Sequence, residues 1–339
     1  MADPILSVRD LHTQFHGREG IVRAVDGVDF DVFEGRTLGV VGESGCGKSV
    51  TARSILGIVD RPGRVMGGQI LLRPQGGGPP VDLATLPQAA MRRIRGPEIA
   101  LVFQEPMASF SQHYTIGNQI TEAILLHMGL GKRAARARAI ELLDMVGVPQ
   151  PDRRIDEYPF QLSGGLRQRV MIAMALACDP RVLIADEPTT ALDVTTQAQI
   201  LDLLRDLQQK RGLAIILITH DMGVIAEMAH DVAVMYLGRA VETGPVQDIF
   251  NRPRHPYTRA LLRSIPTVMA RPRTRLPTIE GSIPHPFDRP RGCAYHPRCS
   301  EKLGAVCETH EPPPIDTEHR QVRCFLHGGI PGAPPGTQP

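Results

Sequence analysis

The sequence predicts an α/β fold built around a parallel sheet, with a small cysteine-rich extension at the C-terminus. VLIAD (182–186) and AIILIT (214–219) are continuous apolar runs of strand length. That pattern is typical of parallel strands that are covered on both faces. LGVV (38–41) leads directly into the glycine-rich loop GESGCGKS (42–49), after which the spacing of apolar residues is helical. This order of strand, loop and helix is the second observation that favours the α/β class.

Other segments follow from the same patterns. Short strands are expected at ILSV, VDFDV and IALVF, and an exposed loop at residues 73–90 around GGGPP. Helices are expected over residues 116–146 and over HPYTRALLRSI (255–265). From Met269 onward prolines dominate, so we expect a core domain at 1–268 and an extension at 269–339.

Composition limits the classes of function. The 339 residues are 42% hydrophobic, and 38 basic residues balance 36 acidic ones. This balance gives no electrostatic footprint for nucleic acid, and no apolar run reaches the roughly 20 residues of a membrane span. The N-terminus MADPILSVRDLH lacks the features of a signal peptide. We therefore expect a cytosolic chain, whose six cysteines are reduced.

GESGCGKS fits the phosphate-loop pattern G-x-x-x-x-G-K-[ST] in its required context. Loop amides would bind phosphate oxygens, Lys48 would reach the β and γ phosphates, and the Ser49 hydroxyl would ligate Mg²⁺. A glycine-rich turn before a helix is the alternative. The residues expected to surround the phosphates are Gly42, Ser44, Gly45, Cys46, Gly47, Lys48, Ser49 and Val50.

VLIADEP adds two carboxylates at the end of a buried strand. Asp186 would bind Mg²⁺ directly or through water. Glu187 would act on the attacking water, as a general base or by orienting it. A solvated acidic pair after a strand is the alternative.

QLSGGLRQRV (161–170) contains no obvious catalyst. Ser163, Gly164 and Gly165 begin a helix and form a second anion-binding N-terminus. A second phosphate site on one chain is redundant unless it serves a nucleotide held by another subunit. The alternative is an ordinary serine N-cap with a glycine turn.

These motifs, with Gln104 in LVFQEP, TALD (190–193) and ITHD (218–221), stand in an order that resembles the ABC ATPase family over residues 5 to about 265. The resemblance implies a P-loop NTPase of the ABC type, with a RecA-like core, an antiparallel β subdomain and a helical signature subdomain. It also implies that two ATPase subunits pack head to tail, so that each ATP lies between the phosphate loop of one subunit and the LSGG signature of the other.

The resemblance also implies roles for single residues. Gln104 would contact Mg²⁺ or the water and report to transmembrane subunits, and Asp193 would cross the dimer interface or cap the following helix. His220 would contact the γ-phosphate. Phe15 would stack on the adenine, with His16 as the alternative.

Within the family, LGVVGESGCGKS, FQEPMAS and HPYTRALLRSIP resemble the ATP-binding subunits of oligopeptide and dipeptide importers. The resemblance implies a peripheral position on the cytoplasmic face of the inner membrane. The implied partners are a second ATPase subunit, identical or different, two permease subunits and an extracytoplasmic peptide-binding protein. SFSQHYTIG, Leu166 and Cys46 depart from the usual pattern without removing a catalytic group.

Two alternatives remain at this point. Relatives of this branch also move nickel or oligosaccharides. A soluble ABC ATPase acting on nucleic acid is disfavoured by the near-neutral charge and by the short interval between phosphate loop and signature.

Cys293, Cys299, Cys307 and Cys324 gather near the C-terminus, with no C-x-x-C pair among them. Four thiolates suffice for a [4Fe–4S] cluster, which the importer resemblance implies at these positions. Zn²⁺ and four unrelated thiols are the alternatives. Cys178 is expected to be a buried apolar residue. Substitute ligands would be His296, His310, His319 and His327.

Overall fold

The computed structural model describes residues 3–190, 192–265, 278–317 and 319–332. They form two compact units that interleave along the chain. The first unit comprises residues 3–5, 32–37 and 85–218, and the second comprises 6–31, 38–84 and 219–332, apart from the gaps just named.

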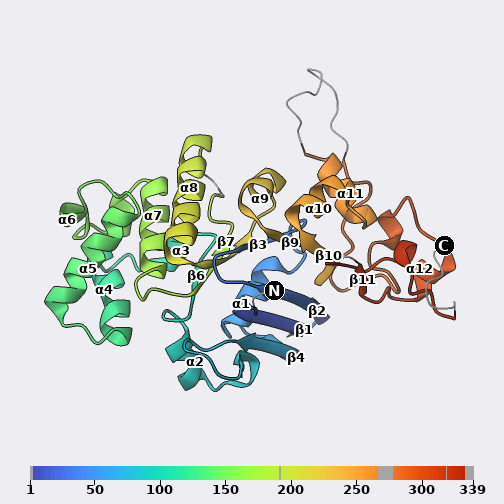
Figure 1. Ribbon diagram of the computed structural model, residues 1–339, viewed down its shortest axis with the longest axis horizontal. Helices are drawn as coiled ribbons and strands as arrows, with labels where there is room; N and C mark the ends of the chain where they lie inside the picture. Colours follow the sequence, from blue (N-terminus) through green and yellow to red (C-terminus); the bar gives the residue numbers. More distant parts are fainter. Residues whose placement is uncertain (1–2, 191, 266–277, 318, 333–339) are drawn as a thin grey trace. The chain divides into compact units, whose positions relative to one another are not determined.

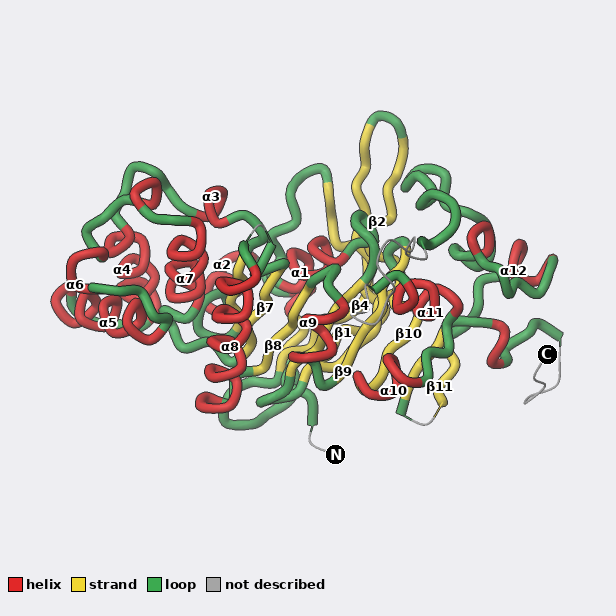
Figure 2. The backbone as a smooth tube through the Cα atoms, turned by 90° about the horizontal axis from the view of Figure 1, so that it is seen from above, coloured by secondary structure: helices red, strands yellow, loops and turns green. Residues whose placement is uncertain are grey.

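The first unit contains three parallel strands in the order β6 (Ile99–Val102), β7 (Val182–Asp186) and β8 (Ala214–Ile218), which Figure 2 draws in yellow. Every residue of β7 and β8 is buried. This burial confirms the expectation of a parallel sheet, because a strand covered on both faces has no polar side to alternate with its apolar one.

The helices α4 to α7 gather into one group, green in Figure 1. The predicted helical stretch 116–146 is two helices, because Gly129 adopts a left-handed φ of 64° between them. The helices of this unit are α2 (Gln88–Ile94), α3 (Pro106–Ser109), α4 (Ile116–His127), α5 (Lys132–Met145), α6 (Pro151–Arg154), α7 (Gly164–Ala175) and α8 (Val194–Arg211).

The second unit contains an antiparallel sheet in the order β2-β1-β4-β5. Its strands are β1 (Leu6–Gly17), β2 (Gly20–Val32), β4 (Gly63–Leu72) and β5 (Val81–Asp82). The prediction of a continuous loop over 73–90 is wrong. Val81 and Asp82 pair with Leu72 and Leu71, the Asp82 carboxylate accepts from Ile70 N at 3.0 Å, and α2 begins at Gln88.

A further run of strands in the second unit has the order β3-β9-β10-β12-β11. β3 is parallel to β9, and the later pairs are antiparallel. The strands are β3 (Thr37–Val41), β9 (Asp231–Tyr236), β10 (Arg239–Pro245), β12 (Arg320–Val322) and β11 (Ile315–Thr317). The helices are α1 (Lys48–Ile55), α9 (Met222–Met228), α10 (Val246–Asn251), α11 (Pro256–Arg263) and α12 (Ala305–Thr309).

Residues 278–332, here called the extension, therefore add β11 and β12 to the edge of this sheet through β10. The expected boundary at 268/269 lies outside the described residues. The helix expected at 255–265 is present as α11.

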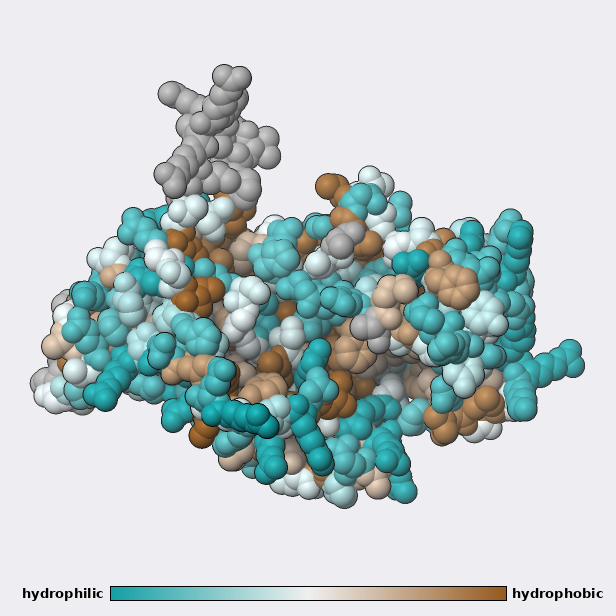
Figure 3. Space-filling model, turned by 180° about the vertical axis from the view of Figure 1, so that it is seen from behind, coloured by the Kyte–Doolittle hydropathy of each residue, from teal (hydrophilic) through white to brown (hydrophobic). Residues whose placement is uncertain are grey.

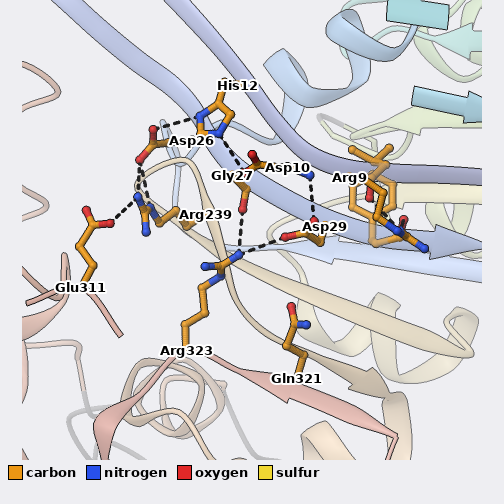
Figure 4. A network of polar contacts seen from close by, with 12 residues as sticks. Arg9, Asp10, His12, Asp26, Gly27, Asp29, Arg239, Glu311, Gln321 and Arg323 are labelled. Atoms are coloured by element: carbon orange, nitrogen blue, oxygen red, sulfur yellow. Dashed lines mark hydrogen bonds and ion pairs between the residues drawn. The ribbon is translucent and has the colours of Figure 1, made fainter. Parts of the chain in front are cut away.

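Buried charges fasten the extension to β2 (Figure 4). The Asp26 side chain is only 6% exposed, and its Oδ2 lies 2.8 Å from Arg239 Nη2 and 2.8 Å from Arg289 Nη1. Arg323 of the extension reaches Asp29 Oδ2 at 3.0 Å and the carbonyl oxygen of Gly27 at 3.2 Å. These contacts offset the low apolar content of the extension, because Arg289 lies against the buried Asp26 carboxylate and Arg323 donates to two acceptors.

Hydrophilic side chains cover much of the surface on the face drawn in Figure 3. On the face drawn in Figure 3, hydrophobic side chains stand in small groups among hydrophilic ones. Within the described part of the chain, no helix is long and apolar enough to cross a membrane.

Asp26→Asn should lower the free energy of unfolding by about 3–5 kcal/mol, because it removes the buried carboxylate that faces Arg289 and Arg239, of which Arg239 keeps only Glu311 at 2.7 Å. Burial raises the pKa of Asp26, but Arg289 and Arg239 outweigh that effect and hold the pKa below its usual 3.8. The carboxylate contribution is therefore complete above pH 3.8 and is lost as pH falls through the lowered pKa. Urea unfolding of the two proteins should show their difference shrinking at low pH.

The matched control is Asp60→Asn, which breaks an exposed pair with Arg53 at 2.8 Å. Its cost should stay below about 1 kcal/mol. Equal costs for the two variants would contradict the importance assigned to the buried network.

Candidate functional site

The phosphate loop connects β3 to α1 in the second unit, as the sequence predicts. Two of its glycines are required by close approach. A Cβ on Gly42 would lie 2.2 Å from the carbonyl oxygen of Met235, and one on Gly47 would lie 2.2 Å from that of Ala24. Both glycines also have left-handed φ values. The loop thus packs against the backbones of β9 at Gly42 and β2 at Gly47, where no side chain fits.

Lys48 is buried and lies along the loop. Its Nζ donates to the carbonyl oxygens of Gly42 at 2.7 Å and Glu43 at 3.1 Å, and lies 3.8 Å from Cys46 Sγ. Burial raises the pKa of the Cys46 thiol, although the charge of Lys48 opposes this effect. Cys46 therefore packs as a neutral side chain, and Lys48 is the cation of the loop.

Glu43 is held at three points, none of which the motif predicts. Its N–H donates to Tyr257 Oη at 2.9 Å, and its carbonyl oxygen accepts from Lys48. Its carboxylate accepts two bonds from Arg298, at 2.7 and 3.1 Å. Tyr257 belongs to α11, and Arg298 ends the short helix His296–Arg298 of the extension. Sequence reasoning missed Glu43, Tyr257 and Arg298, because the contacts that join them span more than 200 positions.

Aromatic side chains support these contacts. The rings of Tyr236, Tyr257 and Tyr295 lie with centroids 4.7 to 5.4 Å apart. Arg298 lies beside this cluster, with its guanidinium carbon 5.8 Å from the centre of the Tyr236 ring. Three segments, β9, α11 and the extension, thus meet beside Glu43 of the phosphate loop.

In the first unit the structure brings Gln104 and Glu187 together. Gln104 Nε2 donates to Glu187 Oε2 at 2.9 Å, and Thr190 Oγ1 donates to the same oxygen at 2.9 Å. Asp186 is buried at the end of β7, and Glu187 has a left-handed φ of 47°. Two donors on one oxygen fix the orientation of the carboxylate in a half-buried turn.

The signature residues lie at the start of α7, also in the first unit. Ser163 is the N-cap, and its side chain accepts from Leu166 N at 3.4 Å. Asp193 is the N-cap of α8 and accepts from Thr196 N at 3.0 Å. A Cβ on Gly165 would lie 2.8 Å from Thr196 Cγ2, so α7 and α8 begin side by side. Gly164 is exposed with open space around its Cα.

The remaining candidates lie in the second unit. Phe15 is half-buried on β1 and packs over Gly63, while His16 lines a surface hollow with Arg61, Arg64 and Met66. His220 is exposed just before α9. Within the loop and the first turn of α1, Ser44 and Gly45 are exposed and Ser49 and Val50 are half-buried.

The four C-terminal cysteines line one small cavity between the extension and the start of α11, together with His296 of the extension and with His255 and Pro256 at the start of α11. All four are free thiols. Among the described residues, however, no group of three or more His, Cys, Asp or Glu side chains is arranged to hold a metal ion. The predicted cluster is therefore not confirmed. Cys178 is buried elsewhere, as expected, with its pKa raised to about 11 by burial and by Asp179.

The geometry agrees with comparisons to known proteins. The ABC transporter family model matches residues 25–190. A putative peptide import ATP-binding protein of Brucella ovis is 50% identical over 95% of this chain and 97% of its own length. The chain belongs to the ABC transporter ATPase family. The dipeptide transport ATP-binding protein DppD of Escherichia coli is 48% identical over 94% of this chain and 96% of its own.

Solved ABC structures share the fold. The dimeric ABC transporter cassette MJ0796 matches with a TM-score of 0.62 at 26% identity, over 71% of this chain and 98% of that one. CbiO1 from Clostridium perfringens, part of an ABC transporter complex, matches with a TM-score of 0.60 at 27% identity, over 74% and 92%. Residues 241–307 of this ABC ATPase match a second family model, the C-terminal region of oligopeptide/dipeptide transporters.

Gly47→Ala should lower the free energy of unfolding by about 3 kcal/mol and abolish ATP binding, because the new methyl group meets the backbone of β2. Gly45→Ala is the matched control: Gly45 also has a left-handed φ, but its Cα faces open space. Its cost should be about 1 kcal/mol. Denaturant unfolding and titration with ATP would measure both, and equal effects would contradict the close approach at Gly47.

Proposed function

We propose that this chain is the ATP-hydrolysing subunit that powers peptide import through an inner-membrane ABC transporter. The observation that carries the proposal is the match of residues 241–307 to the C-terminal region of oligopeptide/dipeptide transporters. Two relatives that cover nearly the whole chain are named for peptide and dipeptide transport. Nickel and oligosaccharides are the alternative cargoes.

ATP binds first to the phosphate loop in this proposal. The amides of Gly45 to Lys48 and the Lys48 ammonium would hold the phosphates, and Ser49 would ligate Mg²⁺. The packing of Gly42 and Gly47 against two backbones supports a loop of fixed shape. Preorganised donors bind anions well because they need no rearrangement. Phe15 is the proposed adenine platform, with His16 as the alternative.

Hydrolysis is assigned to Glu187, which would orient and deprotonate the attacking water. The hydrogen bonds from Gln104 and Thr190 to its carboxylate support this role, because they fix the base before the water arrives. Asp186 and Gln104 are the further proposed Mg²⁺ ligands. His220 would contact the γ-phosphate.

The signature residues Ser163, Gly164 and Gly165 would bind the γ-phosphate of ATP held by a second ATPase subunit, with Asp193 at the interface. Their exposed or half-exposed position at the N-terminus of the twelve-residue helix α7 supports contact with an anion. The assembly would include that second subunit, identical or different, two permeases and an extracytoplasmic peptide-binding protein. Its place would be peripheral, on the cytoplasmic face of the membrane.

We further propose that residues 1–268 are the ATPase domain and that 269–339 hold a metal through Cys293, Cys299, Cys307 and Cys324. A [4Fe–4S] cluster is preferred, and Zn²⁺ is the alternative. The support is one cavity lined by four free thiols from separate segments of the extension. A bound metal would cross-link these segments, in an extension with few apolar residues.

Glu187→Gln should bind ATP normally and lower hydrolysis at least about 100-fold, because the amide keeps the shape but cannot accept the proton of the water. ATPase rates of the membrane complex and ATP titration measure the two effects. Cells that carry only this variant should lose uptake of labelled dipeptide.

Thr190→Val is the matched control, since it removes one hydrogen bond to the carboxylate and keeps the base. Its loss should be less than about tenfold. Near wild-type hydrolysis by Glu187→Gln would contradict its role, and loss of nickel or oligosaccharide uptake with normal dipeptide uptake would contradict the cargo.

Cys299→Ser should lose the metal, because it removes one of four ligands. Iron, sulfide and zinc would be measured per chain in anaerobically purified protein, with visible absorbance as the sign of a cluster. Cys178→Ser is the control, because it removes a buried thiol far from the extension in sequence and should keep full metal content. One zinc per wild-type chain would replace the cluster by the alternative, and no metal would contradict the site.

A further inference from the structure

The phosphate loop contains an acid where it is expected to attract an anion. Glu43 is the second residue of GESGCGKS, and its carboxylate would repel bound phosphates unless its charge were balanced. The three-point attachment described above therefore has an electrostatic consequence as well as a structural one.

Arg298 balances that charge. Its side chain is 3% exposed, and it donates from both terminal nitrogens to the two oxygens of Glu43. Such a bidentate pair also fixes direction, because the planar guanidinium admits one arrangement of the carboxylate. Burial alone would lower the pKa of Arg298, but the hydrogen bonds to Glu43 and Tyr236 raise it, so the residue stays charged.

Arg298 is itself fixed within the extension. Its Nε donates to the carbonyl oxygen of Glu280 at 2.9 Å, and a Cβ on Gly281 would lie 3.3 Å from its Cγ. Tyr295, one turn earlier, is buried in the aromatic cluster with Tyr236 and Tyr257. The extension thus holds the guanidinium in place, and the guanidinium fixes the direction of the Glu43 carboxylate.

We propose that Arg298 is a positioning residue for nucleotide binding: it neutralises the charge of Glu43 and holds the Glu43 carboxylate away from the phosphates. The inference rests on the proposed binding of ATP to this loop. It assigns to the extension a direct part in the nucleotide affinity of the ATPase.

The test is a double-mutant cycle in the full chain, with MgATP titration as the readout. Arg298→Gln should weaken MgATP binding on the order of tenfold, because it exposes the phosphates to the unbalanced Glu43 charge. Adding Glu43→Gln should restore affinity to within about threefold of wild type, because the offending charge is then gone. A merely structural role for Arg298 predicts no recovery, since the double variant lacks both partners.

The matched control is Arg323→Gln, which breaks another buried anchor of the extension, to Asp29, without touching the loop. It should reduce thermal stability but leave MgATP affinity unchanged. An equal loss of affinity in Arg323→Gln, or no recovery in the double variant, would overturn the inference. So would unchanged affinity in Arg298→Gln.

If Arg298→Gln does not fold, Arg298→Lys decides. Lysine keeps the charge but replaces two parallel contacts by a point charge, so affinity should fall about threefold and return with Glu43→Gln. An Arg298→Lys affinity equal to wild type would overturn the positioning role, because charge alone would then suffice. Lys48→Ala separates this inference from the proposed function. Wild-type MgATP binding that Lys48→Ala leaves intact would overturn the assigned phosphate loop, and the role of Arg298 with it. If Lys48→Ala loses MgATP binding while the Arg298 variants bind as tightly as wild type, the phosphate loop stands and only the role of Arg298 is overturned.

Discussion

The salt bridge between Glu43 and Arg298 is the constraint on which the loop and the extension both depend. It joins residues that are 255 positions apart, and it is buried on the arginine side. Breaking a buried pair by removing one partner typically costs about 3–5 kcal/mol, because the remaining charge stays in a poorly solvating environment. The pair therefore couples the loop to the extension, because a shift of Arg298 would leave the Glu43 carboxylate without its counter-charge beside the phosphate loop.

The same principle explains how an extension with so few apolar residues folds at all. Its arginines 289, 298 and 323 reach the carboxylates of Asp26, Glu43 and Asp29, all of which precede the first helix. Each contact joins an arginine of the extension to a carboxylate of the N-terminal segment, and Asp26 also faces Arg239 of β10. Aromatic packing at Tyr295 adds the apolar burial that ion pairs lack.

Sequence patterns predicted what depends on neighbours along the chain. The phosphate loop, the buried strands β7 and β8 and the helix α11 all follow from local residues and their spacing. The patterns failed where distant segments decide. Val81 and Asp82 were expected in a loop, yet pairing with β4 makes them a strand. The contacts of Glu43 with Tyr257 and Arg298 leave no pattern in the sequence near Glu43, because the partners lie more than 200 positions away.

The HPYT stretch shows how a resemblance can be given a physical reason. Glu242 of β10 accepts from His255 N at 2.9 Å, and His255 Nδ1 accepts from Tyr257 N at 3.0 Å. Accepting requires a neutral ring, and burial, with the charges of Arg259 and His327, lowers the pKa of His255 to about 3. The capped helix then presents the Tyr257 hydroxyl to Glu43 N. Histidine and tyrosine at this spacing therefore connect β10 to the phosphate loop through a series of hydrogen bonds. This series ends at the backbone N–H of Glu43, whereas Arg298 binds the Glu43 carboxylate.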